Sequence, residues 1–112
     1  QIAGIEAIFG DQKELLAMKQ EYINRMEYFV EGLNSINGIS CIKPKGAMYA
    51  FPNIKGTGLS SNDFAKKCLD EAEVALLPGN CFGLFGEGYA RVSFVNSKSV
   101  IKRAIERLHD VF

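Results

Sequence analysis

Apolar side chains recur every three or four residues at both ends of the chain, which is the spacing of one helix face. This pattern predicts a helix over residues 11–35, with apolar positions such as Leu16 and Leu33, and another over residues 97–109. A third helix is predicted over residues 61–71, with Ser60 as the N-cap. The first helix would be roughly 37 Å long, which is more than so small a domain requires.

Between these helices the period changes to two, as in a strand with one buried face. Residues 89–95 alternate most clearly, and shorter strands are predicted at 39–42, 48–51 and 74–77. The glycine-rich stretch 80–88 is predicted to be a loop with unusual backbone angles. The predicted fold is therefore α+β with two layers: a small mixed or antiparallel sheet, covered by helices on one face, with a long N-terminal helix.

Composition is that of an ordinary globular domain. The 112 residues are 47% hydrophobic and 23% charged, and a folded chain of this mass exposes about 6,100 Å². Thirteen basic residues balance thirteen acidic ones, which argues against binding to nucleic acid or to an anionic membrane. No apolar run approaches the roughly 20 residues of a membrane span. We expect a single domain that is large enough to hold its own core.

The cysteines and the chain start bear on the cellular context. Cys41, Cys68 and Cys81 are odd in number and lack CxxC spacing, which favours a reducing cytoplasm over a disulfide framework or a zinc site. With His109 as the single histidine, a metal site is not expected. The chain begins at Gln1 without a methionine, so we expect it to be cut from a longer protein.

Arg91 is the first candidate for chemistry. It lies in the middle of the predicted strand 89–95, opposite the apolar positions, and a guanidinium held on a strand can bind a carboxylate through two hydrogen bonds. The alternative is an arginine on the solvent face of an edge strand. The loop 78–83, which contains Asn80 and Cys81, is either the lining of a cleft or a plain connection. Residues 56–61 are interpreted as a loop and N-cap rather than a phosphate site.

Three motifs in order, GAMYAFP at 46–52, PGNCFG at 78–83 and GEGYARVSF at 86–94, resemble the C-terminal part of class I aminotransferases. These are fold-type I enzymes of the aspartate aminotransferase superfamily that depend on pyridoxal 5′-phosphate. The resemblance implies that residues 1–10 are a remnant of the large domain. It further implies that residues 11–112 are the small domain, with helix 11–35 as the connector.

The resemblance also implies roles for single residues. Arg91 matches the arginine that binds the substrate α-carboxylate, and Asn80 lies in the loop near the cleft, where the family often has Ser or Thr. The lysine that forms the Schiff base, the aspartate that pairs with the pyridinium nitrogen and the phosphate-binding residues all belong to the large domain. No catalytic, cofactor-binding or metal-binding residue is therefore expected in this chain, and the isolated chain should be inactive.

The parent enzyme implied by the resemblance would exchange an amino group between an amino acid and a 2-oxo acid, and would be a homodimer. A chain separated from its large domain would expose apolar surface, so self-association is expected. The alternative is a stand-alone module that binds carboxylates, or a structural interaction domain without catalysis.

Overall fold

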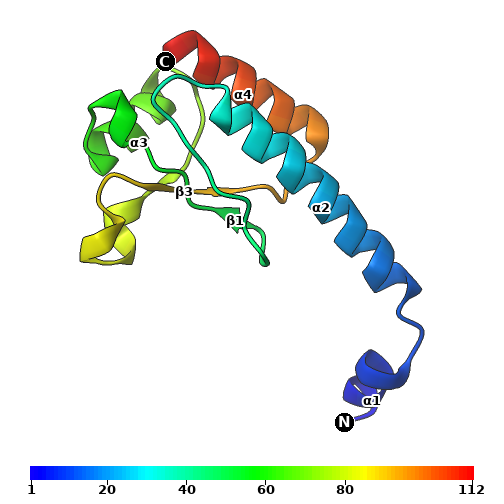
Figure 1. Ribbon diagram of the computed structural model, residues 1–112. Coiled ribbons are helices and arrows are strands. Elements are labelled where there is room, and N and C mark those ends of the chain that lie inside the picture. The colour runs from blue at the N-terminus through cyan, green and yellow to red at the C-terminus, as the bar shows by residue number, and fades with distance from the viewer.

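The computed structural model describes all of residues 1–112 and confirms an α+β fold (Figure 1). Helices lie at both ends of the chain, and short strands alternate with helical turns between them. In chain order the elements are α1 (Ile2–Phe9), α2 (Lys13–Asn34), β1 (Tyr49–Ala50), the 3-10 turn η1 (Lys55–Thr57), α3 (Ser61–Asp70), β2 (Leu77–Pro78), the 3-10 turns η2 (Gly79–Phe82) and η3 (Leu84–Gly86), β3 (Ala90–Ser93) and α4 (Lys98–Val111).

The sheet has the order β1-β3-β2, and both pairings are antiparallel. Tyr49 pairs with Ser93 on one side of β3, and Leu77 pairs with Arg91 on the other. The strands are shorter than the sequence predicts. Residues 39–42 contribute only an isolated bridge between Ser40 and Asn53, and 74–77 forms a strand only from Leu77 onward. Pro78 is the last residue of that strand, and the 3-10 turn η2 begins at Gly79 directly after it.

Helices cover one face of the sheet, where they form one core with it. Ala90 and Val92 of β3 point into this core and are 0% and 8% exposed. The helices contribute buried apolar side chains from three directions, namely Phe29, Val30 and Leu33 of α2, Phe64 and Cys68 of α3, and Ile101, Ile105 and Leu108 of α4. The core thus fixes the orientation of β3, whose alternate residues face the opposite way.

Helices α2 and α4 approach each other closely at Gly32. A Cβ atom added to this glycine would lie 2.8 Å from the Ile105 side chain. Glycine weakens the last turn of a helix by up to about 1 kcal/mol, and here it makes room for the neighbouring helix. The two helices also meet where Ser35 Oγ lies 2.8 Å from His109 Nε2, so the single histidine joins the ends of two helices.

The predicted start of one helix is confirmed, and that of another differs by two residues. Ser60 accepts a hydrogen bond from the backbone N–H of Asp63 at 3.1 Å, as expected of an N-cap. The long helix begins at Lys13 rather than at Asp11. Asp11 Oδ1 accepts from the backbone N–H of Lys13 at 3.0 Å, so its carboxylate forms a short turn ahead of the helix.

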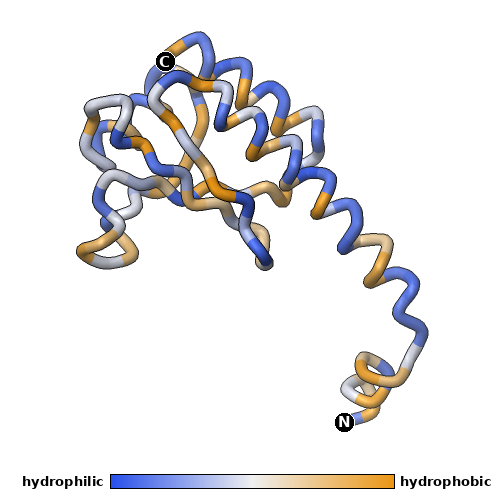
Figure 2. Tube along the Cα trace, viewed as in Figure 1, coloured by the Kyte–Doolittle hydropathy of each residue, from blue (hydrophilic) through white to orange (hydrophobic).

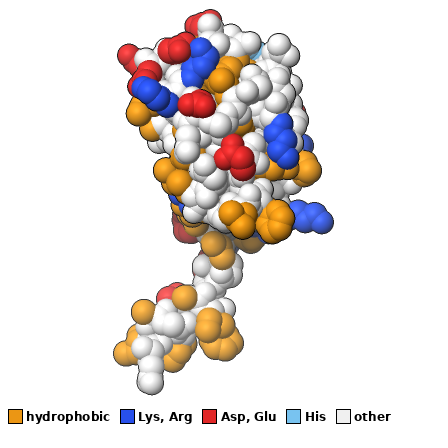
Figure 3. All heavy atoms as spheres, turned by 90° about the vertical axis from the view of Figure 1, so that its left-hand side faces the viewer, with side chains coloured by type: hydrophobic (Ala, Val, Ile, Leu, Met, Phe, Trp, Pro, Cys, Tyr) orange, Lys and Arg blue, Asp and Glu red, His pale blue; other side chains and the backbone are white.

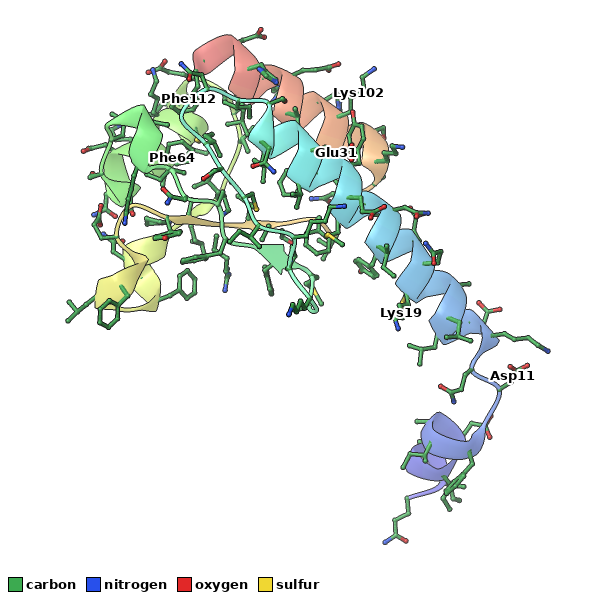
Figure 4. The ribbon with its side chains drawn as sticks, viewed as in Figure 1. Asp11, Lys19, Glu31, Phe64, Lys102 and Phe112 are labelled. Atoms are coloured by element: carbon green, nitrogen blue, oxygen red, sulfur yellow. The ribbon has the colours of Figure 1, made fainter.

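The N-terminal part of the chain projects away from this body. Residues 2–9, where no helix or strand was predicted, form α1, and Asp11 lies at the bend between α1 and α2 (Figure 4). The radius of gyration is 16.3 Å, compared with about 13 Å for a compact domain of this length. The exposed surface is 7451 Å², which exceeds the roughly 6,100 Å² of a compact chain. None of the helices combines the length and apolar character that a bilayer crossing needs.

Candidate functional site

The face of the sheet that no helix covers carries the main candidate residue. Arg91 and Ser93 alternate with the buried Ala90 and Val92 along β3 and lie on the uncovered face. Figure 4 shows side chains that project from this face, away from α2 and α4. Arg91 lies on the central strand of the sheet. This contradicts the alternative interpretation, in which it lies on an edge strand.

The guanidinium of Arg91 lies between two aromatic rings. Its Cζ atom is 4.5 Å from the centre of the Tyr49 ring and 4.6 Å from the centre of the Phe82 ring. Tyr49 belongs to β1 and Phe82 to η2, which follows β2, so the rings come from opposite sides of β3. Cation–π contacts of this kind contribute about 0.5–2 kcal/mol each. We define Tyr49, Arg91 and Phe82 as the arginine clamp.

The guanidinium N–H groups of Arg91 form no hydrogen bond and no ion pair within the chain, and the residue is half-buried. The other cations near an aromatic ring include Arg25, which binds the carboxylate of Glu21 at 2.7 Å, and Lys67, which binds that of Glu71 at 2.6 Å. An arginine whose position is held by rings and whose donors stay free is suited to an external carboxylate.

Further aromatic side chains extend the clamp along the open face. The Phe51 ring meets the Phe82 ring edge-on, with centres 6.1 Å apart, and stacks on the Tyr89 ring at 5.5 Å. Lys55 Nζ lies 5.2 Å from the centre of the Tyr89 ring. Through Phe51, the rings of Phe82 and Tyr89 thus belong to one row of aromatic contacts.

The loop that carries Phe82 is held by a close approach of two backbone segments. A Cβ atom on Gly79 would lie 2.2 Å from the Gly86 carbonyl oxygen, and one on Gly86 would lie 1.9 Å from the Gly79 oxygen. Gly83 and Gly88 have φ angles of 115° and 81°, a conformation that side chains disfavour. The predicted loop with unusual backbone angles is confirmed, and each of these glycines has a physical reason.

Asn80 is tied to this loop through Glu87. Its amide nitrogen donates to Glu87 Oε2 at 3.1 Å, and Glu87 Oε1 accepts from the backbone N–H of Ser61 at 2.8 Å. The fully buried Ser61 Oγ accepts from the Gly88 N–H and donates to the Tyr89 carbonyl, both at 2.9 Å. The N-terminus of α3 is thus occupied by the carboxylate of Glu87. Asn80 has no direct contact with Arg91, and its role in substrate binding remains a prediction.

A groove of about 440 Å³ lies between α2 and the segment 44–48. Its lining is mainly apolar and includes Tyr22, Met26 and Met48. Ala47 at its rim has a φ angle of 61°, which is uncommon for a residue with a Cβ atom. The clamp residues do not line this groove.

Sequence analysis identified Arg91 as a candidate site residue but not the two aromatic residues that contact it. Tyr49 and Phe82 are exposed by 42% and 48%. The place of Tyr49 in the predicted strand 48–51 was an available signal, whereas Phe82 lies in a 3-10 turn, where alternation gives none. Cys81, the neighbouring thiol, is exposed and unpaired, whereas Cys41 and Cys68 are buried. Burial raises the pKa of Cys68 to about 12, with a smaller opposing effect of Lys67, so this thiol stays neutral.

Comparison with known proteins shows the family of this chain. Residues 2–108 match the family model described as aminotransferase class I and II. The chain belongs to this family. Its sequence is 44% identical over 110 residues to the aspartate aminotransferase of Pyrococcus horikoshii, covering 96% of this chain and 28% of that protein.

Two solved aminotransferase structures agree in fold. The aromatic aminotransferase from Pyrococcus horikoshii has a TM-score of 0.85 at 41% identity, covering 88% of this chain and 26% of that chain. The alanine aminotransferase from Pyrococcus furiosus has a TM-score of 0.91 at 31% identity, covering 96% and 28%. The chain therefore spans little more than a quarter of the length of these relatives.

Aminotransferases of this family use pyridoxal phosphate. Such a site requires a lysine for the Schiff base and a partner for the pyridinium nitrogen, and its lysine is activated by desolvation or by a neighbouring cation. Every lysine here is exposed except Lys67, which is half-buried and bound to Glu71. These residues do not fit the cofactor by themselves.

Proposed function

We propose that this chain is the C-terminal small domain of a pyridoxal-phosphate-dependent aminotransferase and supplies the arginine that binds the substrate α-carboxylate. The observation that carries the proposal is the free guanidinium of Arg91, held between Tyr49 and Phe82 on the open face of a domain that belongs to this family. The whole enzyme would transfer an amino group between an amino acid and a 2-oxo acid, and the cofactor would supply the electron sink.

Arg91 would serve both half-reactions, because the amino acid and the 2-oxo acid carry the same α-carboxylate. Two parallel N–H···O bonds fix both the position and the rotation of a carboxylate. Hydrogen bonds to a charged group contribute about 1.5–3 kcal/mol each. The relatives are named for aspartate, aromatic amino acids and alanine, which agrees with Arg91 recognising what all amino acids share. Asn80, in the loop next to Phe82, is proposed as a second residue of this substrate site.

The remaining wall of the active site would come from the large domain of the same polypeptide. That domain would hold the Schiff-base lysine and would cover apolar side chains exposed here, such as Ile2, Phe9 and Leu16. In this arrangement residues 1–10 belong to the large domain and α2 connects the two. Closure of the domains would exclude water from the substrate. We propose a cytoplasmic homodimer as the form of the whole enzyme.

The deciding experiment replaces Arg91 in the full-length enzyme. Arg91→Gln removes the charged donors, and we expect kcat/KM to fall at least about a hundredfold for both amino acid and 2-oxo acid. Arg91→Lys keeps the charge without the planar pair of donors and should recover only part of this loss. Unchanged kcat/KM in Arg91→Gln would refute the role.

Two measurements on the 112-residue chain test whether the cofactor site lies in the large domain rather than in this chain. Pyridoxal phosphate followed by borohydride reduction should label exposed lysines at random. A stoichiometric adduct on one lysine would contradict the proposal that the cofactor site lies elsewhere. No transamination should be detected with this chain alone, since the residues that fit the cofactor are not in it.

A stand-alone carboxylate-binding module is the second candidate, favoured by the unpaired donors of Arg91 on an open surface. Calorimetric titration of the 112-residue chain with aspartate, alanine and 2-oxoglutarate separates the two. The domain hypothesis expects weak or no binding, because a single wall buries little of a ligand. Tight binding that is lost in Arg91→Ala would favour the module.

A further inference from the structure

In the arginine clamp, two aromatic rings contact an arginine that is proposed to bind a carboxylate. An arginine side chain has several rotatable bonds and loses about 2 kcal/mol of rotamer entropy when it is fixed. In most ion pairs the partner carboxylate helps to fix it. Arg91 has no such partner in the chain, yet its Cζ atom lies within 4.6 Å of two ring centres. The two rings are therefore the contacts within the chain that can set its position.

We propose that Tyr49 and Phe82 are positioning residues that hold the Arg91 guanidinium in its carboxylate-binding orientation in the absence of substrate. This inference deepens the proposed function and rests on it. The rings occupy the two sides of the guanidinium and leave its N–H groups for the ligand. Preorganisation of this kind lowers the entropic cost of binding, so the clamp acts on the affinity for any ligand that carries the α-carboxylate.

Different parts of the structure hold the two rings in place. Phe82 lies on the loop 79–86, where the close approach of Gly79 and Gly86 fixes the backbone, and it meets Phe51 edge-on. Tyr49 is on β1 and is held by its pairing with Ser93 of β3. Tyr49 is thus attached to a strand that pairs with β3, and Phe82 to the loop that follows β2, the other strand paired with β3. The orientation of Arg91 depends on both pairings.

The first experiment measures the clamp in the 112-residue chain, without cofactor or activity. Nitrogen-15 relaxation of the Arg91 Nε–H reports the side-chain motion on the picosecond-to-nanosecond scale. We expect an order parameter above about 0.8 in the wild type and below about 0.6 in Tyr49→Leu and Phe82→Leu. Tyr49→Phe keeps the ring and should remain near the wild type. A mobile Arg91 in the wild type, or a rigid one in both leucine variants, would overturn the inference.

Phe85→Leu is the matched control. Phe85 lies in the same loop and is 99% exposed, and its ring has no contact with Arg91. Both leucine variants of the clamp replace exposed side chains, so loss of folding is not expected, and a far-ultraviolet circular dichroism spectrum checks this directly. An equal loss of order in Phe85→Leu would show that a general loosening of the loop, rather than the ring contact, controls Arg91.

The second experiment tests the consequence in the full-length enzyme. Phe82→Leu should raise KM about tenfold for the amino acid and for the 2-oxo acid alike, with kcat within about twofold of the wild type. Phe82→Tyr should restore KM. When Arg91 is already Gln, Phe82→Leu should have no further effect, because a positioning residue acts only through the residue that it positions.

The outcomes separate the two proposals. If Arg91→Gln lowers kcat/KM while Phe82→Leu and Tyr49→Leu behave like Phe85→Leu, the proposed function stands and the clamp is refuted. If Arg91→Gln has no effect, both fail. A further loss on adding Phe82→Leu to Arg91→Gln would assign Phe82 a structural role instead.

Discussion

Helix α2 carries one stripe of apolar residues along its length, but its two ends lie in different surroundings. At the C-terminal end, Phe29, Val30 and Leu33 are at most 5% exposed. At the N-terminal end, Leu15 and Leu16 are at least 51% exposed. Figure 2 shows apolar segments recurring over α1 and both ends of α2, although only one end meets the core.

The difference teaches that an apolar stripe specifies a face to be buried but not the surface that buries it. The C-terminal half of α2 packs on α4 and the sheet, and Arg25 ties the middle of the helix to the carbonyl of Val95 at 2.7 Å. Tyr22 still packs against the core, whereas Leu15, Leu16 and Met18 nearer the N-terminus are exposed. Lys19 lies on this N-terminal part of the helix (Figure 4). We call α1 and the N-terminal part of α2 the arm. Figure 3 shows apolar side chains gathered on this arm, below the body.

The largest effect is expected in the packed region. Leu108 of α4 is 2% exposed within the core. Leu108→Ala should lower the free energy of unfolding by about 2–5 kcal/mol, because it removes buried methyl groups and leaves a cavity. Urea melts followed by circular dichroism measure this value. A loss below about 0.5 kcal/mol would show that the C-terminal end of the molecule is as loosely packed as the arm.

The next effect concerns the boundary between the core and the open face. Ser61→Ala leaves the buried N–H of Gly88 without its acceptor, so we expect a loss of about 1–3 kcal/mol in urea melts. Ser99→Ala, on the exposed first turn of α4, serves as control and should change the free energy of unfolding by less than about 0.5 kcal/mol. Equal values for the two variants would contradict the role of Ser61 as an anchor.

A pH dependence of similar size should arise from the buried thiol. Because burial raises the pKa of Cys68 from 9.0 to about 12, the unfolded chain loses this proton first as the pH rises. The stabilising contribution is complete below about pH 9 and is lost progressively toward pH 12, by at most about 1.4 kcal/mol per pH unit.

Urea melts between pH 8 and 11 compare the wild type with Cys68→Ala, in which this part of the slope should vanish. Cys81 is exposed, and Cys81→Ala should retain the slope. A slope unchanged in Cys68→Ala would show that the thiol is not held neutral by the core.

The smallest effect on folding is expected in the arm. Leu16 is 60% exposed, so Leu16→Ala should change the free energy of unfolding by less than about 0.5 kcal/mol. A loss comparable with that of Leu108→Ala would mean that the arm folds back on the body in solution.

The uncovered arm should act on association instead. We expect the 112-residue chain to self-associate in light scattering through the apolar side chains of α1 and the start of α2. Leu16→Glu should weaken this association, whereas a charge on the exposed polar face, such as Asn24→Glu, should not. A monomeric wild type whose α1 stays ordered would refute this expectation.

Much of the fold followed from the sequence, because helices and strands depend on neighbours two to four positions away. The stripe of residues 97–109 predicted α4, Ser60 marked the start of α3, and the alternation at 89–95 placed Arg91 opposite the core. Strand lengths were overestimated, since β2 begins only at Leu77 and residues 39–42 form only an isolated bridge. Pairing depends on partners that are distant in the chain, which the local pattern does not contain. For α1 the pattern gave no prediction.

The sequence by itself determined which residues are apolar on which face, where helices start, and that Arg91 lies on a different side from Ala90 and Val92. Only the tertiary structure decided that Tyr49 and Phe82 lie on either side of the Arg91 guanidinium, and that one end of α2 is buried while the other is not. The physical reason is that local preferences act along a few neighbouring residues, whereas these contacts depend on the pairing of strands that are distant in the chain.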